Sequence, residues 1–72
     1  MEYIKSDMFM DGGTLEFETT AGTFYRDRRL GTKTEGTWFA EYPTDASTPI
    51  NAELAAQLEA LIQSELAKRR NV

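Results

Sequence analysis

Residues 51–70 carry one stripe of large apolar side chains, and this stripe constrains the fold more than any other feature of the sequence. Its members recur at the spacing of one face of an α-helix, i, i+4, i+7, i+8 and i+12: Leu54, Leu58, Leu61, Ile62 and Leu66. Burying such side chains contributes about 1.5–3 kcal/mol each, whereas ordering a residue costs about 1–2 kcal/mol. The helix therefore needs hydrogen bonds and a sheet to lie on.

Both ends of this helix carry the expected signals. Asn51 is a suitable N-cap residue. Glu53 in the first turn and the cations of residues 68–70 in the last turn match the helix macrodipole. An alternative start has Thr48 followed by Pro49 at the first helical position. The sequence predicts a helix over about 51–70.

Residues before the helix follow the two-residue period of β-strands. Leu15 and Phe17 alternate with Glu16 and Glu18, which places the apolar pair on one face and the carboxylates on the other. Three strands are predicted, over about 14–20, 23–30 and 36–42.

The amino-terminal segment allows two interpretations. Asp11-Gly12 is a dipeptide typical of type I′ hairpins, and it favours an additional strand over about 3–10. The competing interpretation is a loose arm whose apolar side chains cover part of the sheet.

These elements define an α+β fold in a single small domain over 1–72. Pro43 ends the third long strand because it cannot donate to a ladder, and residues 43–50 form a linker. We expect an antiparallel meander sheet of three or four strands packed on one C-terminal amphipathic helix.

Charge favours one register for the hairpin around Gly22. A two-residue turn on Ala21-Gly22 would place Glu16 opposite Asp27 and would force alanine to positive φ. A three-residue loop over 20–22 places Glu16 opposite Arg26 instead. We therefore expect the three-residue loop.

This expected register assigns side chains to faces. Phe17 meets Tyr25 on the apolar face. Two cations then share the solvent face with two carboxylates: Arg26 and Arg28 with Glu16 and Glu18.

The chain has no cysteine and no histidine, which limits its chemistry. Disulfides, thiolate zinc sites and imidazole ligands are ruled out, and the commonest general base and the thiolate nucleophile are missing. Residues 31–36 have the glycine spacing of a phosphate-binding loop, but Thr37-Trp38 stands where lysine and serine or threonine are required. Asp7 and Asp11 lack the alternating oxygen ligands of a calcium loop. We expect no catalytic site, no metal and no cofactor, and so no enzyme.

No targeting or membrane segment is expected. The first residues have no basic region and no apolar run, so a signal peptide is not predicted. No stretch approaches the roughly 18 apolar residues of a membrane span. The expected location is cytoplasmic, without a membrane partner.

Charge is unevenly distributed in this chain, whose formal net charge is −4. Residues 26–33 hold three arginines and one lysine against Asp27 alone, and aromatic residues accompany them over 24–39. Sheet-based single-strand binders stack bases on aromatics and track phosphates with such cations. A single-stranded nucleic-acid-binding module is therefore an alternative function, although the net acidity disfavours it. The other interpretations are a core with cross-strand ion pairs, and a surface that recognises the acidic groups of a protein.

The outer face of the expected helix consists of small or polar residues: Ala52, Ala56, Ala60, Gln63 and Ala67. Alanine is the best helix former, and a smooth face would also let a partner backbone approach closely. Glu65 falls on the same face of the helix as the leucine stripe. It either pairs with Arg69 at i+4 or faces the cation of a partner.

The sequence favours a non-enzymatic small protein-binding domain. Very short, acidic, cysteine-free chains with a sheet and one helix are common among phage and mobile-element accessory proteins, including inhibitors of host defence complexes. This chain is similar to them in type, with no motif behind the likeness. The expected partner is another protein, a homodimer is a further option, and nucleic acid is less favoured. The candidate partner-binding residues are Glu16, Glu18, Arg26, Arg28, Arg29, Lys33, Trp38 and Glu65.

Overall fold

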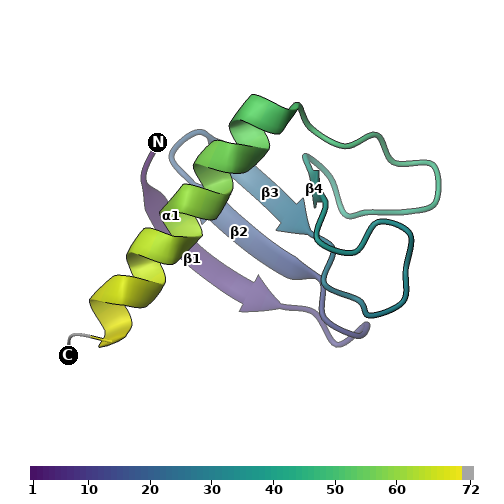
Figure 1. Cartoon of the computed structure of the whole chain (residues 1–72), viewed down its shortest axis with the longest axis horizontal. Coiled ribbons are helices and arrows are strands. Elements are labelled where there is room, and N and C mark those ends of the chain that lie inside the picture. The colour runs from purple at the N-terminus through teal and green to yellow at the C-terminus, as the bar shows by residue number, and fades with distance from the viewer. Residues whose placement is uncertain (71–72) are drawn as a thin grey trace.

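The computed structural model describes residues 1–70 and contains four strands followed by one helix (Figure 1). The elements are β1 (Tyr3–Met8), β2 (Leu15–Thr19), β3 (Gly22–Arg26), β4 (Trp38–Phe39) and α1 (Ala52–Arg70). The strands form one antiparallel sheet in the order β1-β2-β3-β4. The predicted α+β meander is confirmed, and its amino-terminal segment is a strand of the sheet.

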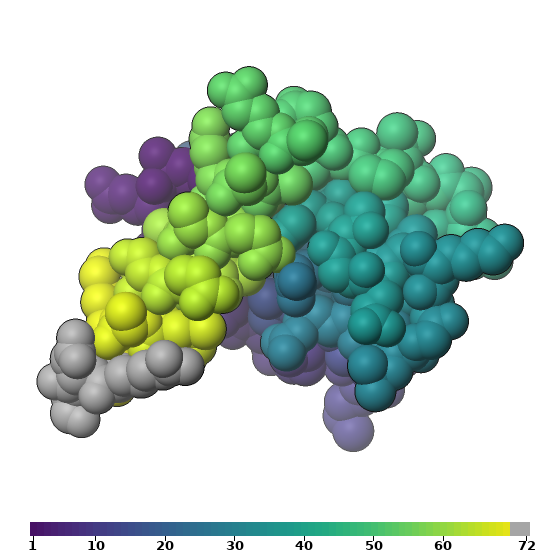
Figure 2. Space-filling model, in the orientation of Figure 1, coloured from purple at the N-terminus to yellow at the C-terminus, as the bar shows by residue number. Residues whose placement is uncertain are grey.

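Helix α1 crosses one face of the sheet diagonally, and its C-terminal turns extend past β1 (Figure 1). The space-filling view shows these turns projecting at one end of the molecule (Figure 2). Asn51 caps the helix, because its Oδ1 accepts a hydrogen bond from the Leu54 N–H at 2.8 Å. The alternative start at Pro49 is wrong, since Pro49 forms an isolated bridge with Phe39.

The core lies between α1 and the sheet. Leu58 has no exposed surface, and it packs with Phe17, Phe24 and Trp38. Three other members of the leucine stripe, Leu54, Leu61 and Ile62, are partly buried against this cluster. Leu66 is 42% exposed, because it lies on the overhanging part of the helix.

The expected three-residue loop between β2 and β3 is wrong. Thr19 pairs with Gly22, so only Thr20 and Ala21 form the turn. The Thr19 side chain closes this turn: its Oγ1 accepts from the Ala21 N–H at 3.1 Å and donates to the Gly22 carbonyl at 2.9 Å. Gly22 takes φ +129°, a conformation that side chains disfavour.

This one-residue difference changes which side chains face the helix. Phe17 stands opposite Phe24, and Glu16 stands opposite Tyr25. Arg26 pairs with Leu15 and lies on the helix side. The prediction that Arg26 shares the solvent face with Glu16 is therefore wrong.

The strands are shorter than predicted because two aspartates hold the intervening loops. Strand β3 stops at Arg26 and β4 spans only Trp38–Phe39, and between them Asp27 fixes an irregular loop. The expected tight turn on Asp11-Gly12 is also wrong. Phe9 donates to the Thr14 carbonyl at 2.9 Å, so a longer loop joins β1 to β2.

Candidate functional site

The face of the sheet turned away from α1 carries most of the charged strand residues. Cross-strand partners share a face, and Phe17 and Phe24 face the helix core. The alternate residues therefore lie on the other side. We call this side the open face, and its exposed or half-buried residues are Lys5, Asp7, Glu16, Glu18, Thr23 and Tyr25. Phe39 of β4 pairs with Tyr25 on the same side but is only 1% exposed, so the face is covered at β4.

The carboxylates of the open face outnumber its single ammonium group. The register places Lys5 opposite Glu18, but Asp7 directly opposite Glu16. Like charges at such positions destabilise a sheet, whereas opposite charges contribute roughly 0.2–1 kcal/mol. The register thus places two carboxylates on neighbouring strands opposite each other, a position that suits an external cation.

Phe9, Tyr25 and Tyr42 form an aromatic cluster at the end of the open face near the β1–β2 loop. The rings of Phe9 and Tyr25 are stacked with centroids 6.2 Å apart, and Phe9 meets Tyr42 edge-on at 5.3 Å. Phe9 and Tyr42 are 37% and 40% exposed. Partial burial, together with the negative charge of Glu16, raises the pKa of Tyr25 above its ordinary value. The cluster therefore offers neutral aromatic surface beside the carboxylates.

Asp11 anchors this aromatic cluster. Its carboxylate accepts from the Thr14 hydroxyl at 2.6 Å and from the backbone N–H groups of Thr14 and Gly13 at 2.9 and 3.1 Å. The Tyr42 hydroxyl donates to the same carboxylate. These hydrogen bonds, that of the Thr14 hydroxyl first, hold the pKa of Asp11 well below its ordinary value, and the bond to Asp11 raises the pKa of Tyr42. An ionised Asp11 thus ties the loop after β1 to the segment after β4.

Asp27 neutralises part of the basic segment 26–33. The carboxylate has no exposed surface, and it accepts from Arg29 Nη2 at 2.9 Å and from Arg29 Nε at 3.1 Å. The hydroxyls of Thr32 and Thr34 donate to its Oδ2. The hydrogen bonds from Arg29 are the first cause that holds the pKa of Asp27 well below its ordinary value. Arg29 therefore orders its own loop.

Arg26 and Trp38 both engage Glu59 of the helix. Arg26 Nε lies 2.6 Å from Glu59 Oε1. Arg26 Nε is buried and makes no hydrogen bond, so this contact is an ion pair. The indole N–H of Trp38 donates to the same oxygen at 2.9 Å. Sequence reasoning missed Glu59. Two features of the sequence point to it: its place at the border of the leucine stripe, and the need of a buried indole N–H for an acceptor.

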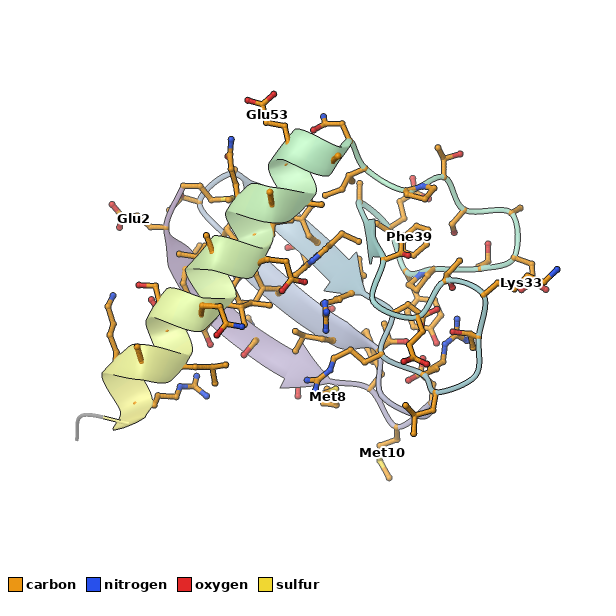
Figure 3. All side chains as sticks on the ribbon, in the orientation of Figure 1. Glu2, Met8, Met10, Lys33, Phe39 and Glu53 are labelled. Carbon is orange, nitrogen blue, oxygen red and sulfur yellow. The ribbon has the colours of Figure 1, made fainter. Side chains whose placement is uncertain are left out.

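The structure therefore does not assemble the predicted cationic and aromatic surface. Trp38 is 2% exposed and belongs to the core. Arg28 is exposed and lines the groove between β1 and α1, so it too lies away from the predicted solvent face. Lys33 points away from the body of the molecule on its loop (Figure 3).

The far end of α1 also differs from expectation. Glu65 pairs with Lys68 at 3.2 Å, so the predicted pairing with Arg69 is wrong. The guanidinium of Arg69 instead donates to the Tyr3 hydroxyl at 3.2 Å, which links the end of the helix to the start of β1. The residues predicted for the outer face of the helix are all exposed: Ala52, Ala56, Ala60, Gln63 and Ala67.

Two further observations concern residues 1–70. Within this range, no group of three or more acidic side chains is arranged so that it could hold a metal ion. Over the same range, no helix combines the length and the apolar character needed to cross a membrane.

Comparison with known proteins gives no relative. No protein-family model matches the chain, and no curated protein and no solved structure matches it either.

Proposed function

We propose that this chain is a non-enzymatic binding domain whose open face docks onto a basic surface of another protein. One observation carries the proposal: the uncovered face of the sheet presents Asp7, Glu16 and Glu18, and Asp7 stands directly opposite Glu16. A cluster of like charges costs folding stability. Bound lysines or arginines would remove this cost, so the repulsion of the free state favours complex formation.

The aromatic cluster gives this face a second kind of contact. Phe9 and Tyr42 combine apolar rings with partial exposure next to the carboxylates. Aromatic residues are enriched at the centres of protein interfaces, whereas charges set the orientation and the association rate. Arginine also stacks on aromatic rings. A partner surface rich in arginine fits both parts of the site.

Proteins that handle nucleic acids carry such basic surfaces, because they neutralise phosphates. A small acidic domain that occupies one would compete with the nucleic acid. The proposed role is that of an accessory factor or inhibitor of a host protein complex in the cytoplasm, of the kind that phages and mobile elements encode.

Direct binding of single-stranded nucleic acid has less support. Arg26 and Arg29 engage Glu59 and Asp27, and Trp38 lies in the core. A gel shift with single-stranded oligonucleotides at low salt is therefore expected to show no complex. A complex that is lost in an Arg28→Gln/Lys33→Gln variant would favour the nucleic-acid interpretation.

The proposal is tested by neutralising the open face. Glu16→Gln/Glu18→Gln is compared with Glu41→Gln/Asp45→Asn, which removes the same charge from exposed positions outside the open face. Each protein is used to capture partners from the native host, and the recovered partner is purified for affinity measurements. We expect the open-face variant to raise Kd roughly tenfold or more and to weaken its dependence on salt.

The control variant should bind like the unchanged protein. The open-face variant should unfold at nearly the same temperature, because the lost repulsion between Glu16 and Asp7 offsets the lost attraction between Glu18 and Lys5. Equal retention of the partner by both variants would rule out the open face as the binding surface.

A further inference from the structure

Strand β1 is an edge strand of the sheet. In the sheet order β1-β2-β3-β4, no strand among residues 1–70 pairs with the outer side of β1. Phe9 donates across the hairpin to Thr14, so the alternation of an antiparallel ladder turns the backbone groups of Ser6 and Met8 outward. Such an edge is a template for a further strand.

The sequence of β1 is self-complementary about Ser6. Lys5 precedes Ser6 and Asp7 follows it, while the next residues outward, Ile4 and Met8, are both apolar. Ile4 and Met8 are 52% and 46% exposed. β1 pairs regularly from Lys5 to Met8, whereas its register against β2 shifts between Tyr3 and Lys5. If two copies of β1 lie antiparallel with Ser6 opposite Ser6, each Lys5 stands opposite an Asp7.

We propose that two copies of this chain pair through β1 in this register and form a symmetric dimer with one continuous sheet. The two Ser6 residues exchange backbone hydrogen bonds on the two-fold axis. In the single chain the Asp7 carboxylate accepts from the neighbouring Met8 N–H at 2.9 Å. In the dimer it turns to the Lys5 ammonium of the second copy.

Charge makes this edge selective. A lysine on an edge strand normally discourages pairing with other strands. Here Asp7, two residues further on, supplies the opposite charge in the register centred on Ser6. Shifting the register by one residue removes the match and turns the side chains to the wrong faces.

The overhang of α1 supports the same arrangement. The two-fold axis places both helices on one side of the joined sheet, and their C-terminal turns extend past β1 toward each other (Figure 1). The groove between β1 and α1 has a volume of about 230 Å³, and its lining includes the apolar Met8, Ile62 and Leu66 as well as Arg28 and Arg69. The second copy would cover Leu66, which is 42% exposed in the single chain. Both open faces then lie side by side on the opposite surface.

The test uses charge reversal and light scattering on the purified protein, without any other partner, so its result is independent of the proposed function. The unchanged protein should approach twice its monomer mass of 8.2 kDa as concentration rises. Asp7→Lys and Lys5→Asp should each weaken dimerisation roughly tenfold or more, since each creates two like-charge contacts. Lys5→Asp/Asp7→Lys should dimerise again.

Mixing the two single variants provides the sharpest result. The Lys5→Asp chain carries two acids and the Asp7→Lys chain carries two lysines, so the mixture should form a heterodimer that neither chain forms alone. Lys5→Asp also changes the pairing of residue 5 with Glu18 in β2. This effect is the same before and after mixing, so it does not account for the formation of a heterodimer. A mixture that stays monomeric would overturn the register.

A backbone variant tests the edge itself. Ser6→Pro removes an N–H that β2 does not use, and edge strands tolerate proline at such positions. Ser6→Ala is the matched control, because it loses the same hydroxyl and keeps the N–H. We expect Ser6→Pro to be folded and monomeric and Ser6→Ala to dimerise. A monomeric unchanged protein, or a dimer that Ser6→Pro leaves intact, would overturn the proposal.

Discussion

Glu59 joins two groups that lie far from it in the sequence. One oxygen of its carboxylate contacts both Arg26 and the indole N–H of Trp38. Trp38 is 2% exposed, and the Glu59 oxygen is the acceptor of its indole N–H. A buried polar group without a partner costs about 1–3 kcal/mol. Glu59 therefore stabilises the contact between α1 and β4 besides balancing a charge.

The first prediction concerns Glu59. Glu59→Ala should lower the free energy of unfolding by about 1–3 kcal/mol, measured by urea denaturation. Glu59→Gln should lose less, since its amide oxygen still accepts from Trp38. Gln63→Ala, at an exposed site of the same helix, should have almost no effect. Equal losses for Glu59→Ala and Gln63→Ala would contradict this role.

The element whose position is best defined by local interactions is α1. Its start is fixed within the chain, because Asn51 Oδ1 accepts from the Leu54 N–H. Its middle is fixed by Leu58, which has no exposed surface. Its last turns lie beyond the sheet, where the hydrogen bond from Arg69 to Tyr3 is a contact with β1.

The second prediction concerns the helix cap. Asn51→Ala should lower the free energy of unfolding by about 1 kcal/mol, because the Leu54 N–H loses its acceptor. Asn51→Asp should keep most of the stability, since aspartate caps equally well. Thermal unfolding followed by circular dichroism measures both. A loss of stability on replacing Thr48 by alanine but not on replacing Asn51 would place the helix start elsewhere.

At the scale of the whole molecule, two ionised aspartates hold irregular segments of the fold. Asp11 ties the β1–β2 loop to Tyr42, and Asp27 ties the β3–β4 loop to Arg29. Both carboxylates have pKa values lowered from an ordinary value of 3.8. A lowered pKa means that the folded state binds the proton less tightly than the unfolded state.

The third prediction follows from these lowered pKa values. The stability that Asp11 and Asp27 contribute is fully present well above pH 3.8 and is lost as the pH falls through this value toward their folded-state pKa values. The unfolding temperature should therefore fall steeply below about pH 4. For Asp27→Asn it should be lower than that of the unchanged protein at neutral pH, and the difference should shrink in acid. A difference that does not change with pH would contradict the role of the Asp27 charge.

The candidate site was only partly predictable from the sequence. The alternation of Leu15 and Phe17 with Glu16 and Glu18 placed both carboxylates on the face away from the core, and the register agrees. Asp7 could not be added, because its position opposite Glu16 depends on the length of the β1–β2 loop. That length is set by the hydrogen bonds of Asp11, including one from Tyr42.

The sequence by itself determined the helix, its cap and the existence of the strands, because these depend on periodicity and on hydrogen bonds between near neighbours. Only the tertiary structure decided the hairpin register and the fate of the basic segment. The Thr19 side chain moved the turn by one residue, and this shift carried Arg26 from the open face to the helix. There the Glu59 carboxylate forms an ion pair with Arg26 and accepts a hydrogen bond from the indole N–H of Trp38. A pairing between residues so distant in the chain has no local signal, since it is fixed by how α1 lies on the sheet.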